Sequence, residues 1–236
     1  MKKALLSTAI VAAIGVSAPG IASAASSGDL LGMTAGVAQT TVVLGSTIQL
    51  DVTGSYFAMD NDGNGTHSGG EKVALSPGTD GGLILDSTQA IGEIDANWDF
   101  FSNTGNHYSK ANTSISNVGA NSFDVSMSGW TVNWAGGDID MSGDNANFSG
   151  DTGIASVTCA VDCSDGDAYT LDFLSHTPKD GGGTSFKGVF YNFHMEGVID
   201  AADVQPPEPV PVPAAVWLFG SGLQGLVGVA RRKKTS

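Results

Sequence analysis

Stretches in which apolar and polar residues alternate cover much of the chain. In residues 122–127 and 130–134 every second side chain is apolar, so each segment predicts a β-strand with one buried face. Ser128 and Gly129 between them predict a turn, and the two strands are expected to form a hairpin. Further strands are predicted at 41–53 (two strands, broken near Gly45), 97–101, 154–158, 168–173 and 186–199.

Glycine-rich turns separate these segments, and glycine accounts for 33 of the 236 residues. Between residues 25 and 205 the 3.6-residue periodicity of amphipathic helices is almost absent. Short strands joined by glycine turns are typical of β-sandwiches and related all-β folds. We therefore expect an all-β protein with a single β-sandwich or jelly-roll-like domain over residues 25–205.

The N-terminus has the pattern of a secretory signal peptide. Lys2 and Lys3 precede an apolar run at 4–16, and small residues follow. The alternative, a buried helix of the fold, does not account for two lysines before the run and a small-residue cleavage site after it. We expect a signal peptide at 1–24, a mature chain from Ala25 and export through the inner membrane of a bacterium.

The charge of the chain is distributed unevenly. All 24 acidic residues lie between Asp29 and Glu208, a stretch with only four lysines and no arginine, so it carries a net charge of −20. Such a surface repels nucleic acid and anionic lipid, and we expect no nucleic-acid partner. The same surface favours divalent cations.

The two cysteines, Cys159 and Cys163, are four positions apart. In an oxidising compartment a local disulfide is the expected state of such a pair. Half of a zinc site or a redox pair are the alternatives, but the chain has no other cysteine and no histidine close in sequence. A loop this short gains little stability from closure.

Residues 60–71 match the calcium-loop pattern D-x-[DN]-x-[DN]-G-x5-E at every specified position. In that pattern oxygen ligands surround a hard cation, a glycine makes the sharp turn and the last glutamate binds through both oxygens. The alternative is an Asp/Asn/Gly-rich surface turn, but a match by composition alone is rare because glutamate is infrequent here. The predicted Ca²⁺ ligands are Asp60, Asp62, Asn64, Thr66 through its carbonyl, Ser68 through a water and Glu71, with Gly65 at the turn.

The surroundings of this loop differ from those of a paired EF-hand. His67 occupies a position that is normally apolar, and residues 50–59 alternate like a strand instead of forming an entering helix. Ser68 and Glu71 have the spacing of a capping box, which predicts a short helix at 71–75. We expect a single calcium loop on a β scaffold, with a structural role.

Two other acidic clusters lack a complete ligand pattern, and we expect them to be solvated faces. They consist of Asp138, Asp140 and Asp144, and of Asp162, Asp165 and Asp167.

No catalytic motif is recognisable, because the four histidines are scattered and the nucleophile-elbow, P-loop and dinucleotide-binding patterns are absent. We expect a protein that is not an enzyme. The alternative is a secreted carbohydrate-binding or polysaccharide-active protein in which Trp98, Trp130 and Trp134 stack on sugar rings. Alternating tryptophans in a domain with few large aliphatic residues are instead expected to fill the core.

The C-terminal segment combines three features. A proline-rich spacer at 206–213 is followed by an uncharged apolar stretch at 214–230 and by a basic cluster at 231–234. The apolar stretch is just long enough to span a bilayer as a helix, with the basic cluster on the cytoplasmic side. A permanent membrane anchor is one interpretation of this segment.

Residues 210–234 also resemble the PEP-CTERM sorting signal in its V-P-x-P-A form. The resemblance is carried by the proline motif, the apolar stretch with Gly220 and Gly222, and the basic tail, although Gln224 stands where leucine is usual. The body resembles proteins with this tail at 57–60, 75–81 and 128–134. The motif residues are Val210, Pro211, Val212, Pro213 and Ala214.

This resemblance implies a partner and a destination. An exosortase, a membrane protease of the transpeptidase kind, would recognise the proline motif and remove the sorting signal at 214–236. The protein would be transiently anchored and then released to the cell surface or to an exopolysaccharide or biofilm matrix. The apolar stretch is in that case a temporary membrane anchor that processing removes.

Overall fold

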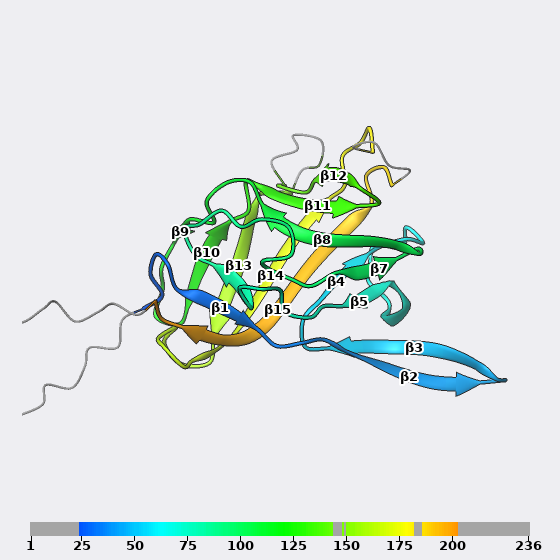
Figure 1. Cartoon of the computed structure of the whole chain (residues 1–236), viewed down its shortest axis with the longest axis horizontal. Helices are drawn as coiled ribbons and strands as arrows, with labels where there is room; N and C mark the ends of the chain where they lie inside the picture. Colours follow the sequence, from blue (N-terminus) through cyan, green and yellow to red (C-terminus); the bar gives the residue numbers. More distant parts are fainter. Residues whose placement is uncertain (1–23, 144–147, 149, 182–185, 203–236) are drawn as a thin grey trace, which may run out of the picture. The chain divides into compact units, whose positions relative to one another are not determined.

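The computed structural model of the chain describes residues 24–143, 148, 150–181 and 186–202. These residues form an all-β structure with fifteen strands and one 3-10 turn, η1 (Gly69–Glu71). The expected all-β class is confirmed. Figure 1 shows the strands gathered into two facing sheets and one separate hairpin.

The larger sheet has nine strands, and all its strand pairs are antiparallel. Its main path runs β5-β4-β15-β14-β13-β10-β9, and β1 pairs with both β15 and β6. The strands are β1 (Leu30–Met33), β4 (Tyr56–Met59), β5 (Lys72–Ala74), β6 (Gly82–Ile84), β9 (Ile115–Ser116), β10 (Ser122–Ser126), β13 (Ile154–Cys159), β14 (Ala168–His176) and β15 (Phe190–Asp200).

The smaller sheet has four antiparallel strands in the order β12-β11-β8-β7. They are β7 (Trp98–Phe100), β8 (Asn103–Ser109), β11 (Trp130–Trp134) and β12 (Gly137–Asp140). The hairpin consists of β2 (Val37–Val43) and β3 (Ser46–Thr53), which pair with each other.

The core lies between the two sheets and is rich in aromatic rings. Trp130 of β11 meets Phe193 of β15 with ring centroids 4.6 Å apart, and Trp98 of β7 meets Phe57 of β4 at 4.4 Å. Burial of large apolar side chains from both sheets supplies most of the driving force for folding. Two antiparallel sheets joined through one apolar core are consistent with the expected β-sandwich.

Strict alternation of burial explains why most strands were predictable. In β14 and β10 every second side chain is buried, as the pattern of apolar residues indicated. The expected strands near 41–53, 97–101, 122–127, 130–134, 154–158, 168–173 and 186–199 are all present, with ends shifted by a few residues.

The predicted hairpin of 122–127 with 130–134 is wrong. β10 pairs with β13 and β9 in the larger sheet, whereas β11 pairs with β12 and β8 in the smaller one. Ser128 and Gly129 do form a turn, since the Trp130 N–H donates to the Met127 carbonyl at 2.9 Å, but the turn carries the chain from one sheet to the other. Both strands bury their apolar residues in the same core, from opposite sides.

The predicted short helix at 71–75 is also wrong. After η1 the chain continues as β5, which pairs with β4 through Tyr56↔Ala74 and Phe57↔Val73. Pairing to the edge of the larger sheet satisfies the backbone groups of these residues more completely than a single turn of helix does.

Candidate functional site

The calcium-type loop, residues 60–71, connects β4 to β5 at the edge of the larger sheet. Its start is fixed to β15, because the Asp60 N–H donates to the Phe190 carbonyl at 2.9 Å. His67 also attaches the loop to β15: its ring stacks on that of Phe190 with centroids 4.7 Å apart, and its Nε2 lies 3.3 Å from the Phe190 carbonyl oxygen. The first residue and the middle of the loop are thereby attached to the first residue of β15.

Three carboxylates converge inside this loop. One oxygen from each of Asp60, Asp62 and Glu71 lies within 4.8 Å of the others. Asp60 and Glu71 are buried and Asp62 is exposed. Three negative charges this close repel one another, and a divalent cation between them would relieve that repulsion.

Backbone N–H groups orient the buried carboxylates. Asp60 accepts from the N–H of Asn64 at 3.1 Å and of Gly65 at 2.8 Å, while Glu71 accepts from Asn61 at 2.7 Å and from Ser68 at 2.8 Å. These bonds pre-organise the oxygens before any ligand arrives.

The same hydrogen bonds keep both carboxylates ionised. Burial raises the pKa of Asp60, but the backbone N–H groups of Gly65 and Asn64 outweigh it, so its pKa lies below the ordinary value. Burial likewise raises the pKa of Glu71, and the N–H and hydroxyl of Ser68 lower it further than burial raises it. Both groups are therefore anionic at neutral pH.

Glycines allow the tight path of the loop. Gly65, which the pattern places at the sharp turn, has φ +80°, and Gly63 has φ +70°. Residues with a β-carbon rarely adopt this left-handed region, so a substitution at either position strains the turn.

The other predicted ligands have local partners in the loop. The Asn64 Oδ1 accepts from the Thr66 N–H at 2.8 Å, and the Asn64 Nδ2 donates to Asp62 at 2.8 Å. The Ser68 hydroxyl donates to Glu71 at 2.9 Å as part of the predicted capping box, which is present. The structure thus brings the three carboxylates together and gives Asn64 and Ser68 a role in shaping the loop.

An open groove runs beside the loop and gives it access to solvent. Its lining includes Asp60, Asp62, His176, Lys187 and Phe190. A cation could therefore reach the carboxylates without opening the core.

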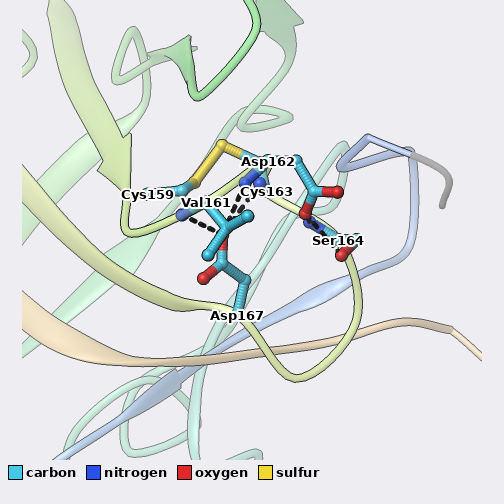
Figure 2. Close-up of a disulfide and its surroundings, with 6 residues drawn as sticks. All are labelled: Cys159, Val161, Asp162, Cys163, Ser164 and Asp167. Atoms are coloured by element: carbon cyan, nitrogen blue, oxygen red, sulfur yellow. Dashed lines mark hydrogen bonds between the residues drawn. A yellow bond between two sulfur atoms is a disulfide. The ribbon is translucent and has the colours of Figure 1, made fainter.

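The cysteine loop is a second organised acidic region, shown in Figure 2. Cys159 and Cys163 form the expected disulfide, with an S–S distance of 2.03 Å. One oxygen of Asp167 accepts from three successive N–H groups, those of Val161, Asp162 and Cys163, at 2.9, 2.9 and 3.0 Å.

This arrangement corrects the interpretation of Asp167 as part of a solvated face. Asp167 is buried, and although burial raises its pKa, the N–H groups of Val161 and Asp162 lower that pKa below its ordinary value. Its neighbour Asp162 caps the same loop by accepting from the Ser164 hydroxyl at 2.6 Å. The cluster holds the disulfide loop in shape, and the sequence signal was present only as acidic residues near the cysteines.

Asp138, in the other acidic cluster, is exposed as expected but is firmly bound. Hydrogen bonds from Tyr108, Asn133 and Lys110 lower its pKa to about 2. Asp140 of this cluster accepts from the Ser142 N–H at 3.0 Å, and Asp144 lies outside the described residues.

On the outer face of the larger sheet, His194 bonds to two carboxylates. Burial lowers its pKa, but the hydrogen bonds to Asp172 at 2.8 Å and Glu196 at 3.1 Å raise it more, so the net pKa is above the ordinary value. Tyr56 stacks on the His194 ring, with centroids 4.7 Å apart.

A buried Asp–His pair in the core was not foreseen from the sequence. Asp95 and His107 are completely buried, and the Asp95 carboxylate accepts from the His107 N–H at 2.8 Å, from the Trp98 Nε1 at 3.0 Å and from the His107 ring. Within the part of the chain that the structure describes, His107 Nε2 has no hydrogen-bond partner. The pair has no solvent access, so it is part of the packing. Twelve residues separate the two in sequence, and only the pairing of strands brings them together.

The tryptophans fill the core, as expected. Trp98 and Trp130 are buried, and Trp134 is half-buried and packs against the same cluster. The rings of Trp98 and Trp130 are therefore not free to stack on a polysaccharide, and the carbohydrate-binding alternative loses two of the three residues on which it depended.

The predicted signals at both ends lie almost entirely outside the described residues. These are the signal peptide at 1–24, of which only Ala24 is described, the spacer at 206–213 and the sorting signal at 214–236 with its motif. Among the residues that are described, no helix has the length and hydropathy needed to cross a membrane.

Comparisons with known proteins identify no relative: no family model, no curated protein and no solved structure matches this chain. The likeness to PEP-CTERM proteins therefore stays an expectation from the sequence.

Proposed function

We propose that this chain is an exported, non-enzymatic surface or extracellular-matrix protein whose β-sandwich body is stabilised by Ca²⁺ in the loop 60–71. An exosortase-type protease would process its C-terminal sorting signal. The proposal joins the two terminal signals in the sequence to an acidic all-β body.

The observation that carries the calcium part is the convergence of Asp60, Asp62 and Glu71 in a loop that matches the calcium pattern at every specified position. Calcium prefers carboxylate and carbonyl oxygens, and the loop offers these in a pre-organised, solvent-accessible form. The remaining ligands would come from the Thr66 carbonyl, from a rotated Asn64 side chain and from water. In this role the ion ties β4 to β5 and so closes one edge of the larger sheet.

A chelation experiment tests this role. Loops of extracellular modules bind Ca²⁺ with dissociation constants of about 10⁻⁴ to 10⁻³ M, so 10 mM Ca²⁺ is expected to raise the melting temperature by about 3–10 °C over EGTA. Asp60→Asn should abolish this shift. Asp99→Asn, at an exposed carboxylate on β7 with the same change of charge, should keep it. A melting temperature that Ca²⁺ does not change contradicts the calcium proposal.

A second experiment tests export and sorting independently of calcium. Intact-mass analysis of the protein from its bacterial host is expected to show a chain that starts at Ala25 and lacks residues 231–236. Replacing Pro211 and Pro213 by alanine should leave the C-terminus uncut and keep the protein with the membrane fraction. A wild-type chain that retains the basic tail rules out processing, and a permanently anchored protein becomes the better interpretation.

A further inference from the structure

The hairpin β2–β3, residues 37–53, is an arm that leads away from the two sheets (Figure 1). Among the described residues, the contacts between the arm and the body are at its base. Val52 is buried, the Gln49 amide donates to the carbonyls of Gly69 and Lys72, and Lys72 forms a salt bridge with Asp51 at 2.7 Å. The outer half of the arm has solvent on both faces.

The strand register separates the two faces of the arm. Val43 pairs with Ser46 and Thr41 with Ile48, so these four side chains share one face, which we call the outer face. Thr40 pairs with Gln49 and Val42 with Thr47 on the opposite face, the one whose base binds the body.

The outer face carries two aliphatic side chains, which the described residues leave exposed, whereas the opposite face carries one, Val42. Val43 is 47% exposed and Ile48 is 46% exposed, and Leu44 at the tip is fully exposed. Leu44 also has φ +51°, a left-handed conformation that turns normally assign to Asn, Asp or Gly. An isolated two-stranded hairpin is marginally stable in water, so this arm gains most from a partner that covers it.

The charge distribution selects the kind of partner. Residues 30–50 contain no charged residue, in a chain whose stretch 29–208 carries −20. A basic partner would be attracted to the acidic body and not to the uncharged outer part of the arm, residues 37–50. A lipid surface is disfavoured, because the same residues lack the aromatic and basic side chains that anchor segments at membrane interfaces.

A second copy of the chain fits the arm. An identical arm presents the same uncharged outer face with its two aliphatic side chains, and a two-fold axis lets the two faces cover each other. The seven residues of β2 span about 23 Å, so arms packed in opposite directions hold the two acidic bodies apart by more than the Debye length of about 8 Å. Contact through the arms thus avoids the repulsion that the bodies would suffer in direct contact.

We propose that two copies of this chain associate through the outer faces of their arms, Thr41, Val43, Ser46 and Ile48 of one packing on the same residues of the other. This inference does not depend on calcium or on sorting.

Sedimentation velocity of the protein purified from the cells that make it tests the proposal, with two matched variants. Ile48→Lys places a charge in the contact and should raise the dimer dissociation constant at least about tenfold. Thr47→Lys adds the same charge on the opposite face of the same strand and should change it less than about threefold. Both variants should keep the wild-type melting temperature, because both positions are exposed.

Several outcomes overturn the proposal. A wild-type protein that stays monomeric at millimolar concentration has no such contact. Equal weakening by both lysines shows that the outer face is not the interface. A monomer whose arm resists proteolysis indicates that another segment of the chain covers it, and flotation with phosphatidylcholine vesicles that Ile48→Lys abolishes indicates a membrane instead.

Discussion

Removing the Asp95 carboxylate is expected to destabilise the protein more than any exposed acidic substitution. Asp95 is completely buried and accepts hydrogen bonds from the Trp98 indole, from the His107 backbone and from the His107 ring. Asp95→Ala removes this shared acceptor, but His107 Nδ1 lies 3.3 Å from the Trp98 Nε1 and can accept from it. Two donors are therefore left without an acceptor, at about 1–3 kcal/mol each. Because a water can enter the space that the side chain leaves, we expect the lower half of that range, a total of about 3 kcal/mol.

Replacing the partner instead gives an independent check on this reasoning. His107→Phe keeps the aromatic volume between Trp130 and Phe193 but removes one of the three donors to Asp95, which then stays buried with two. Loss of one partner of a buried pair costs about 3 kcal/mol. Removal of His107 Nε2, which has no hydrogen-bond partner among the described residues, offsets part of this cost. The order of stability should therefore be wild type, His107→Phe, Asp95→Ala.

Urea unfolding at pH 7, followed by tryptophan fluorescence, measures these differences. Asp99→Ala, at an exposed carboxylate, is the control and should change the free energy of unfolding by less than about 0.5 kcal/mol. The reasoning is refuted if Asp95→Ala costs less than about 2 kcal/mol, or if His107→Phe costs more than Asp95→Ala.

Three further predictions concern the disulfide and two titrating groups. Replacing Cys159 and Cys163 by serine should lower the free energy of unfolding in urea by about 2 kcal/mol, because the disulfide closes a loop between residues only four apart. A decrease of more than about 4 kcal/mol would show that loop entropy is not the main cause. Burial lowers the pKa of His194, but its two carboxylate partners raise that pKa by more, so the folded pKa lies above the unfolded one. The protonated ring therefore stabilises the fold fully below the unfolded pKa, and this stabilisation is lost as the pH rises through the folded pKa. Between pH 6 and 9 the stability of wild type should fall relative to that of His194→Gln. Asp138, with a pKa lowered to about 2 by its hydrogen bonds, stabilises the fold above its unfolded pKa and loses this contribution as the pH falls from about 4 to 2. Acid titration of Asp138→Asn should lack that step, and an identical profile for the two proteins would show that the hydrogen bonds to Asp138 contribute nothing.

The sequence predicts the strands well where one face of the strand is apolar. β10 and β14 alternate so regularly that their positions and buried faces follow from the side chains alone. β8 was missed because its sequence, Asn-Thr-Gly-Asn-His-Tyr-Ser, is polar. Its buried members Asn106 and His107 bond to Asn97 and Asp95, which lie in the segment before β7. Local patterns carry no information about such partners.

Strand pairing was not predictable for a related reason. Segments 122–127 and 130–134 show the same alternation whether they pair with each other or face each other across the core. The loop 60–71 could be found because its ligand spacing is local, and the disulfide because its cysteines are four residues apart. The buried pair Asp95–His107 could not, because its members are twelve positions apart and come together only through the pairing of β7 with β8.

The place of β15 in the larger sheet has a consequence for the order of folding. β15 pairs with β14, β4 and β1, yet it is the last strand of the described chain. At about 5–20 residues per second, synthesis of the chain up to Asp200 takes roughly 10–40 s, and for most of that time β1 and β4 lack the strand to which they bind. Contacts between residues so distant in sequence close slowly, and the aromatic core cannot form until Tyr191 and Phe193 have been made. The body therefore folds only after its whole length is available, and a chain that stops short of β15 leaves three strands without their common partner.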